Sequence, residues 1–196
     1  YLGGNVVFKT TDEGLYWEVI SDDLTNDIKD RQKITGTPWL SEYFGQEIHS
    51  TIKRLTESPV QQGVIWSGSD DGKIYITKDG GGDWEDISIT DGIPEYSQVY
   101  EIEPSPYDAA TAYIVFSNFN VYDEYKPYIF KTTDYGKTWT NLSDKFPQDE
   151  ITRTIREDKI RKGLLFIGTE TGVYYSLNDG QSWDKLKANL PAVPVV

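Results

Sequence analysis

The sequence has 196 residues, no cysteine and a single histidine, and these scarcities exclude several kinds of chemistry. Without cysteine there is no disulfide, no thiol nucleophile and no cysteine-ligated zinc. One histidine cannot form a multi-histidine metal site. His49 is also the only residue that could be the base of a Ser-His-Asp triad. We therefore expect His49 to be a packed or hydrogen-bonded residue at the start of a strand.

Positive charge is also scarce, with 19 lysines and arginines against 32 acidic residues and a net charge of −13. Nucleic-acid phosphates and anionic membrane surfaces both attract basic faces, so the sequence argues against either partner. No stretch is apolar enough to span a bilayer. The chain opens with Tyr1-Leu2-Gly3-Gly4 rather than a signal peptide, so we expect any targeting segment to lie upstream.

Aromatic residues, in contrast, are abundant. They make up 14% of the chain, including 14 tyrosines and 6 tryptophans, a content that a disordered chain would lack. The length is sufficient to bury a core. Glycine and proline are scattered along the chain, which favours many short strands joined by turns.

An eight-residue pattern, S/T-x-D/N-x-G-x-x-W, occurs four times and is here called the box. The boxes span residues 10–17, 77–84, 132–139 and 176–183. The segments before them alternate or run apolar, as strands do: 6–10, 73–77, 128–132 and 173–176. Further strand-like segments follow them: 17–20, 84–89, 139–142 and 183–186. Each box is therefore predicted to be a hairpin turn.

The residue types of the box suit a turn rather than a catalyst. Hydroxyl and carboxylate side chains can hydrogen-bond the turn's own backbone, glycine can adopt positive φ, and tryptophan can bury a large ring. We assign structural roles to Thr10, Asp12, Gly14, Trp17, Thr77, Asp79, Gly81, Trp84, Thr132, Asp134, Gly136, Trp139, Ser176, Asn178, Gly180 and Trp183. Asn178 replaces the usual aspartate, but its amide oxygen can accept the same hydrogen bonds.

Two further strands precede each complete box hairpin. First strands are predicted at 51–56, 99–103 and 151–156, and second strands follow within 63–72, 112–117 and 163–172. Successive box tryptophans are 67, 55 and 44 residues apart, and the shortest interval matches a four-stranded propeller blade of roughly 40–45 residues.

The repeat predicts an all-β chain of β-propeller blades, four-stranded antiparallel meanders that form an incomplete ring of about three and a half blades. The expected divisions are a partial blade of third and fourth strands at 1–20, an insertion loop at 21–50, a blade at 51–89, a blade at 90–142 with an insertion at 118–127, a blade at 143–187 and a tail at 188–196. We expect sequence outside this chain, or a partner chain, to complete the ring.

The boxes resemble the Asp-box, or BNR, repeats of sialidases, xyloglucanases and sortilin-type receptors. Segments 7–12, 20–25, 131–139, 155–158 and 168–172 are similar to the C-terminal part of proteins labelled sortilin-like or "glycosyl hydrolase, BNR repeat". The resemblance covers nearly the whole chain. It implies a propeller, an extracellular or periplasmic location, and boxes on peripheral turns away from any active site.

Successive strands of a meander run in opposite directions, so successive turns lie alternately on two faces. The turns between second and third strands therefore lie on the same face as the connections from one blade to the next. Both long insertions, 21–50 and 118–127, belong to this insertion face, and the boxes belong to the opposite, box face. Long loops on a rigid scaffold are where function usually resides.

Aromatic and acidic residues in these loops are the ligand-binding candidates: Trp39, Tyr43, Phe44, Glu47, Phe119, Tyr122, Asp123 and Tyr125. Aromatic rings beside carboxylates suit stacking on sugar faces and binding of hydroxyl groups. The alternative is that each ring packs its loop onto its own blade.

These features favour a binding or scaffolding module of a larger extracytoplasmic protein, with a glycan or polypeptide ligand on the insertion face. The alternative is part of a sialidase- or xyloglucanase-like glycoside hydrolase whose catalytic carboxylates, roughly 5–9.5 Å apart, lie partly outside this chain. A third hypothesis is an interaction protein whose exposed blade edge pairs with another chain.

No catalytic pair can be chosen from the sequence, and Arg153 and Arg156 are expected to form surface ion pairs rather than a sialidase-type arginine cluster. No cofactor or metal ligand set is predicted, although calcium in the acidic loops stays an alternative.

Overall fold

The computed structural model describes residues 1–196 except 33–35, 38–39, 42–48, 120–123 and 188–190. The described residues form four antiparallel sheets, a separate two-stranded hairpin and two short 3-10 helices. None of these helices is long and apolar enough to cross a membrane.

The four sheets follow one another along the chain, and within each the strands pair in sequence order. Sheet 1 contains β1 (Leu2–Gly3), β2 (Val7–Lys9) and β3 (Glu18–Val19). Sheet 2 contains β6 (Ile52–Glu57), β7 (Ile65–Ser69), β8 (Ile74–Thr77) and β9 (Glu85–Asp86). Sheet 3 contains β10 (Gln98–Pro104), β11 (Ala112–Asn118), β12 (Glu124–Thr132) and β13 (Thr140–Asn141). Sheet 4 contains β14 (Thr152–Glu157), β15 (Leu165–Thr169), β16 (Gly172–Ser176) and β17 (Asp184–Lys185).

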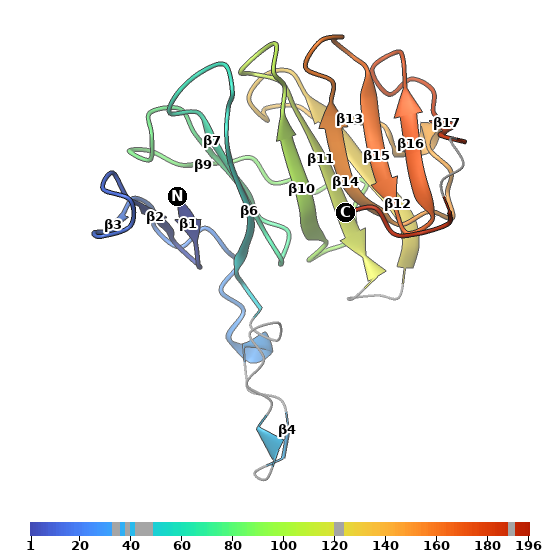
Figure 1. Cartoon of the computed structure of the whole chain (residues 1–196). Helices are drawn as coiled ribbons and strands as arrows, with labels where there is room; N and C mark the ends of the chain where they lie inside the picture. The colour runs from blue at the N-terminus through green and yellow to red at the C-terminus, as the bar shows by residue number, and fades with distance from the viewer. Residues whose placement is uncertain (33–35, 38–39, 42–48, 120–123, 188–190) are drawn as a thin grey trace.

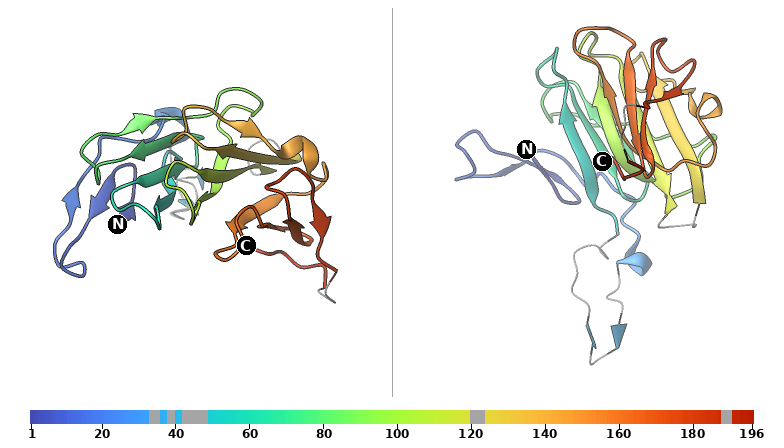
Figure 2. Two further views of the ribbon diagram at one scale, coloured as in Figure 1. Left: turned by 90° about the horizontal axis from the view of Figure 1, so that it is seen from above. Right: turned by 45° about the vertical axis from the view of Figure 1, so that its right-hand side comes forward.

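The sheets fan out side by side along an arc, with sheet 1 at one end and sheet 4 at the other (Figures 1 and 2). The connection from sheet 1 to sheet 2 holds the 3-10 helix η1 (Lys29–Arg31) and the hairpin of β4 (Gly36–Thr37) and β5 (Leu40–Ser41). The connection from sheet 3 to sheet 4 holds the 3-10 helix η2 (Ser143–Lys145).

Two predicted boundaries are wrong. Sheet 1 has three strands rather than two, because β1 pairs with β2 through Leu2 opposite Phe8 and Gly3 opposite Val7. The insertion at 118–127 is partly strand, since β11 and β12 continue their pairing to Asn118 opposite Glu124. Both differences arise because tertiary pairing extends strands into segments whose own sequence reads as a loop.

The hydrophobic core lies between the sheets. In β11 successive side chains point to opposite faces of sheet 3. Ile114 and Phe116 pack toward sheet 2 with Trp66, whereas Tyr113 and Val115 pack toward sheet 4. Because both faces of this sheet are covered, β11 is buried along its whole length.

Backbone hydrogen bonds tie the turns together at both ends of the sheets. On one face, Gly80 N donates to Gly63 O and Asp179 N donates to Gly163 O, both at 2.9 Å, which joins the boxes to the turns between first and second strands. On the other face, Asp70 N donates to Thr51 O at 2.9 Å. The structure therefore has the box face and the insertion face that alternation of strand direction predicts.

Candidate functional site on the insertion face

The box residues hold the hairpin turns. In the third box, Thr132 Oγ1 accepts Gly136 N at 2.9 Å and donates to Asp134 Oδ1 at 2.8 Å. Asp134 in turn accepts the hydroxyl of Thr138 at 2.7 Å and its amide at 2.9 Å. These hydrogen bonds, the Thr138 hydroxyl first, hold the pKa of Asp134 below its ordinary value.

The fourth box makes equivalent hydrogen bonds without a carboxylate. Ser176 Oγ accepts Gly180 N at 2.8 Å, and Asn178 Oδ1 accepts Ser182 N at 3.0 Å. The Asn178 side-chain amide also donates to Ser182 Oγ at 2.9 Å. A negative charge is therefore not needed for the turn to form.

The boxes also join neighbouring sheets, which sequence reasoning missed. Trp84 Nε1 donates to Ile20 O of the preceding sheet at 2.8 Å, and Trp139 Nε1 donates to Ile87 O at 3.0 Å. The overlooked signal is an isoleucine or leucine three residues after every box tryptophan. The box face therefore carries contacts that hold neighbouring sheets together.

The tryptophan of the fourth box does not form the hydrogen bond to the preceding sheet that Trp84 and Trp139 form. Trp183 Nε1 is buried without a hydrogen-bond partner in the structure. The carbonyl at the corresponding position, Leu142 O, accepts Lys145 N of η2 at 3.2 Å. The ring of Phe146, which follows η2, packs edge-on against Trp183 with centroids 5.4 Å apart. The connection after sheet 3 therefore replaces a polar contact with an aromatic one.

Two of the predicted ligand-binding residues are described by the structure. Phe119 and Tyr125 flank the tip of the β11–β12 hairpin, and their rings meet edge to face with centroids 5.5 Å apart. Tyr125 is 51% exposed. The remaining candidates lie outside the described residues: Trp39, Tyr43, Phe44, Glu47, Tyr122 and Asp123.

Phe119 and Tyr125 form one wall of an open groove of about 370 Å³ between sheets 3 and 4. The groove is completed by the connection between these sheets, by β14 and by the β15–β16 turn, which contribute Asp149, Glu150, Ile151, Arg153, Glu170 and Thr171. Sequence reasoning did not connect these residues with the aromatic pair, because they come from a different sheet.

Charged groups in this groove are held in fixed positions. The Arg153 guanidinium pairs with Glu170 and lies over the Tyr100 ring, 4.7 Å from its centroid. Glu150 accepts the hydroxyl of Thr171 at 2.6 Å and that of Tyr174 at 2.8 Å. Burial would raise the pKa of Glu150, but these hydrogen bonds lower it below its ordinary value.

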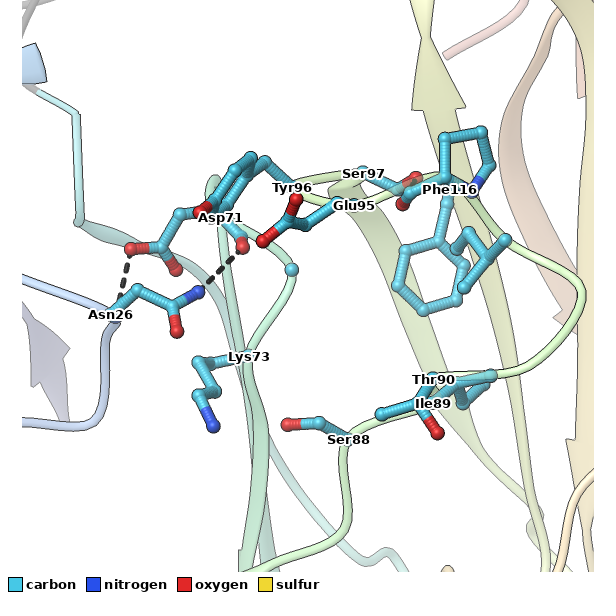
Figure 3. Close-up of a pocket in the computed structure, with 13 residues that line it drawn as sticks. Asn26, Asp71, Lys73, Ser88, Ile89, Thr90, Glu95, Tyr96, Ser97 and Phe116 are labelled. Atoms are coloured by element: carbon cyan, nitrogen blue, oxygen red, sulfur yellow. Dashed lines mark hydrogen bonds between the residues drawn. The ribbon is translucent and has the colours of Figure 1, made fainter. Parts of the chain in front are cut away.

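A second cavity, of about 270 Å³, lies between sheets 2 and 3 (Figure 3). Its lining includes the apolar side chains of Phe116 and Ile89 and the polar residues Asp71, Lys73 and Ser88. Two hydrogen bonds close one side, because Asn26 N donates to Asp71 Oδ2 at 2.8 Å and Asn26 Nδ2 donates to Asp71 O at 2.9 Å. Lys73 Nζ donates to Asp86 at 2.6 Å, and this hydrogen bond raises the pKa of Lys73.

Among the described residues one group could supply three metal ligands, namely His49, Asp70 and Asp71, whose ligand atoms lie within 4.8 Å of one another. All four carboxylate oxygens of the two aspartates already accept hydrogen bonds, from Thr51, Asn26 N and Ser69 Oγ. His49 lies just before β6, with Nδ1 3.3 Å from Ser50 Oγ. These contacts give the group a structural role in joining loops of the insertion face.

The first strands of sheets 2 to 4 are joined by ion pairs. Arg156 Nη2 lies 2.8 Å from Glu101 Oε2, and Arg54 Nε lies 3.6 Å from Glu101 Oε1. Glu103 on the same strand has a pKa raised by burial, although the charge of Arg156 opposes that rise. Arg153 and Arg156 are therefore each paired with a carboxylate, Glu170 and Glu101 respectively, and do not form an arginine cluster.

No model of a known protein family matches this sequence, and a search of the curated proteins found no match. Solved structures do share the fold. A GH74 xyloglucanase from Xanthomonas campestris superposes with a TM-score of 0.65 at 15% identity, over 95% of this chain and 28% of the enzyme. An ancestral GH74 enzyme gives 0.63 at 16% identity, over 93% of this chain and 21% of the enzyme.

A third structure, YCF48 bound to a D1 peptide, gives a TM-score of 0.53 at 20% identity, over 69% of this chain and 39% of that one. The chain consists of β-propeller blades. The predicted fold class is thereby confirmed, with three four-stranded blades and one three-stranded blade among the described residues. This chain spans between about a fifth and two fifths of the length of these three proteins.

Proposed function

We propose that this chain is a binding or scaffolding module of a larger Asp-box propeller protein, and that its ligand lies in the Phe119–Tyr125 groove. The observation that carries the proposal is the pair formed by the exposed Tyr125 and the half-buried Phe119, beside a fixed arginine and several carboxylates. An extracytoplasmic location belongs to the same proposal and is supported by the resemblance of the boxes to those of sialidases and sortilin-type receptors.

The groove offers the contacts that a sugar chain needs. The Tyr125 ring presents an apolar surface for the flat face of a pyranose, and carboxylates such as Glu170 can accept its hydroxyl groups. A polypeptide is the second ligand class, since Arg153 and the acidic residues suit polar backbone groups. Each ligand class has a precedent among solved structures that resemble this chain. One is a xyloglucanase, and another is YCF48 bound to a D1 peptide.

Binding can be tested by titrating xyloglucan oligosaccharides, a wider glycan panel and a peptide library against the chain. Tyr125→Ala and Phe119→Ala should each weaken binding by about fivefold or more, which corresponds to the roughly 1 kcal/mol expected of a central contact residue. Tyr16→Ala is the matched control, because Tyr16 is 72% exposed on the box face and should leave binding unchanged.

The outcomes separate the ligand classes. Glycan binding that depends on Tyr125 supports the favoured assignment, and peptide binding with the same dependence moves the ligand to the second class. Binding that is equally strong in both groove variants, or no binding by any glycan or peptide, would refute the groove as a ligand site.

The likeness to GH74 enzymes favours one alternative, that the chain contributes to a glycoside hydrolase. A general acid needs a raised pKa, whereas the pKa of Glu150 in the groove is lowered. The pKa of Glu103 is raised, but Glu103 lies near the box-face end of β10, opposite Tyr113, and is not among the residues that line the groove.

The test is polysaccharide hydrolysis by the full-length protein carrying Asp149→Asn or Glu170→Gln. Turnover lost in either variant, with folding intact, would favour the enzyme.

A further inference from the structure

The cavity between sheets 2 and 3 is separate from the Phe119–Tyr125 groove, since the two share no lining residue. It lies on the insertion face, under the connection formed by residues 88–97, and is bounded by the β7–β8 turn and by Asn26 (Figure 3). Its volume of about 270 Å³ is near the lower limit of ligand pockets, which span roughly 300–1,000 Å³. A small molecule or a single side chain fits this volume better than a sugar chain does.

One side of the cavity is apolar. Phe116 is 1% exposed and belongs to the core between the two sheets. Ile89 and Ile93 of the connection pack against the same core but are only half-buried. Together with Pro94 they line the cavity, so part of their surface is open to whatever enters it. This side offers a hydrocarbon or aromatic group an apolar surface to cover.

The connection after sheet 3 begins in the same way and then differs. Ser88 Oγ accepts Ile74 N at 3.0 Å, and Ser143 Oγ accepts Ile129 N at 2.8 Å. After sheet 3 the chain goes on to Phe146, which is 3% exposed and packs on two aromatic rings of sheet 4. The seven residues that follow Ser88 include no aromatic residue. The connection after sheet 2 therefore leaves apolar side chains beside a cavity, whereas the connection after sheet 3 buries its ring.

The opposite side of the cavity presents a fixed hydrogen-bond acceptor. The Asn26 side-chain amide donates to Asp71 O at 2.9 Å, and Asn26 N donates to Asp71 Oδ2 at 2.8 Å. A backbone carbonyl can only accept, so this contact assigns the nitrogen and leaves Oδ1 of Asn26 as the other end of the amide. Within the part of the chain that the structure describes, Asn26 Oδ1 accepts no hydrogen bond.

This side of the cavity is also negatively charged. Asp71 is 1% exposed, and its carboxylate accepts hydrogen bonds from neutral groups but has no ion pair with a described residue. Glu95 adds a second carboxylate at the exposed edge. Lys73 is the cation of the lining, and its ammonium lies 2.6 Å from Asp86, which neutralises it. Because buried charges are normally paired, a cation is the group that this side lacks.

The wall that carries Glu95 is held in place without a ligand. Tyr96 has φ +60°, and the Arg31 guanidinium lies over its ring, 4.4 Å from the centroid. Ser97 Oγ donates to Pro94 O at 2.5 Å. Gly72 has φ +89°, and a Cβ atom there would lie 3.1 Å from Ser97 O, so the β7–β8 turn and the connection are in close contact. The cavity is therefore preformed, as ligand pockets usually are.

We propose that this cavity binds a small organic cation, an ammonium group carried on an apolar body. The ammonium donates to Asn26 Oδ1 and to the Glu95 carboxylate, with the charge of Asp71 close by, and the apolar body covers Phe116 and Ile93. Figure 3 shows Asn26, Asp71 and Glu95 together on one side and Phe116 on the other. The net charge of −13 further raises the concentration of cations near the chain. This site goes beyond the proposed function, because it uses neither the groove nor its ligand.

The proposal is tested by nuclear magnetic resonance titration with three probes that share one apolar body, namely 2-phenylethylamine, 2-phenylethanol and 3-phenylpropionate. The amine should bind about tenfold more tightly than the alcohol, and the carboxylate should not bind. The backbone amides of Asn26 and residues 88–97 should shift. Added salt should weaken binding of the amine but not of the alcohol. N-acetyl-lysinamide, compared with 2-phenylethylamine, shows whether a lysine side chain or a free amine is the better source of the cation.

Two variants separate the charged contact from the apolar one. Glu95→Gln should weaken binding of the amine about three- to fivefold, the factor that corresponds to a partly solvated charge pair, and leave the alcohol unaffected. Its matched control is Glu85→Gln, the same change at an exposed residue outside the cavity. Ile93→Ala should weaken both the amine and the alcohol, by about fivefold or more. Its control is Val60→Ala, at a residue that is 47% exposed on a box-face turn.

The proposal is overturned if the three probes bind equally or none binds, if both cavity variants bind the amine as the wild type does, or if the shifts are confined to the Phe119–Tyr125 groove. Circular dichroism of every variant establishes that it is folded. Tyr125→Ala, in the groove, should leave binding of the amine unchanged. Failure of the cavity and failure of the groove are therefore observed separately.

Discussion

At the scale of single residues, the box depends on hydroxyl and carbonyl oxygens more than on charge. Thr132 is 1% exposed, and its hydroxyl is the acceptor for the buried Gly136 amide. The fourth box has serine at the same position and asparagine where the other boxes have aspartate, and its hydrogen bonds are equivalent. The side-chain oxygens are therefore the part of the box that the turn requires.

Thr132→Val should destabilise the protein, because the isosteric methyl group leaves the Gly136 N–H buried without an acceptor. The expected loss is about 1–3 kcal/mol in the free energy of unfolding, measured by urea denaturation. Thr132→Ser keeps the hydroxyl, as Ser176 does, and should lose clearly less. Equal losses in the two variants would show that the methyl group, and not the hydrogen bond, matters.

The lowered pKa of Asp134 predicts a pH-dependent contribution to stability. A folded-state pKa below the ordinary value of about 3.9 means that the contribution is complete above that value and is lost as pH falls through the folded pKa. The difference in unfolding free energy between wild type and Asp134→Asn should therefore be constant above about pH 5 and narrow below about pH 4. The mirror variant Asn178→Asp should gain stability with rising pH over the same range, and a pH-independent difference in both variants would contradict the assignment.

At the scale of elements, the important unit is the contact between a box and the preceding strand end. Gly136 has φ +83° and lies against Ile87, whereas a Cβ atom at Gly14, which has φ +92°, would meet only Trp17 of the same box among the described residues. The two glycines thus share a backbone conformation and differ in their surroundings. Substitution of the two glycines therefore distinguishes the cost of a side chain at positive φ from the cost of a side chain that collides with the neighbouring blade.

Gly136→Ala should destabilise the protein more than Gly14→Ala. Both variants place a side chain at positive φ, which costs about 1–2 kcal/mol. Only Gly136→Ala also forces Ile87 away, which adds roughly 1–3 kcal/mol of overpacking. Urea denaturation measures both losses, and equal effects would indicate that Ile87 moves away from the added methyl group without cost.

At the scale of the whole molecule, the inner strands are joined through Glu101. Its carboxylate, on sheet 3, lies beside Arg54 of sheet 2 and Arg156 of sheet 4, so one residue links three blades. Glu101 is 8% exposed, while the arginine side chains are about half exposed to solvent. Solvent screening of the arginines limits the strength of these ion pairs.

Glu101→Gln should lower the free energy of unfolding by about 1 kcal/mol, because it removes the charge between two arginines that are partly solvated. The matched control is Glu85→Gln, which disrupts the exposed pair with Lys78 and should change stability by only a few tenths of a kcal/mol, as is typical of surface pairs. The effect of Glu101→Gln should shrink in high salt. A change no larger than that of the control would remove Glu101 from the contacts that hold the blades together.

The sequence by itself determined the blade. Box spacing, strand periodicity and turn residues are local features, so they predicted the hairpins, the number of units and the face on which the insertions lie. Phe119 and Tyr125 were predicted together as ligand-binding candidates because both belong to one insertion, and the structure adds the contact between their rings.

Only the tertiary structure decided which residues from different blades meet. Arg153 and Glu170 line the same groove as Phe119 because sheet 4 packs against sheet 3. Trp84 donates a hydrogen bond to the backbone carbonyl of Ile20 because sheet 2 packs against sheet 1. These contacts form where the face of one sheet packs against the face of the next. The residues involved are far apart in the sequence, and their spacing along the chain does not indicate that they will meet in space.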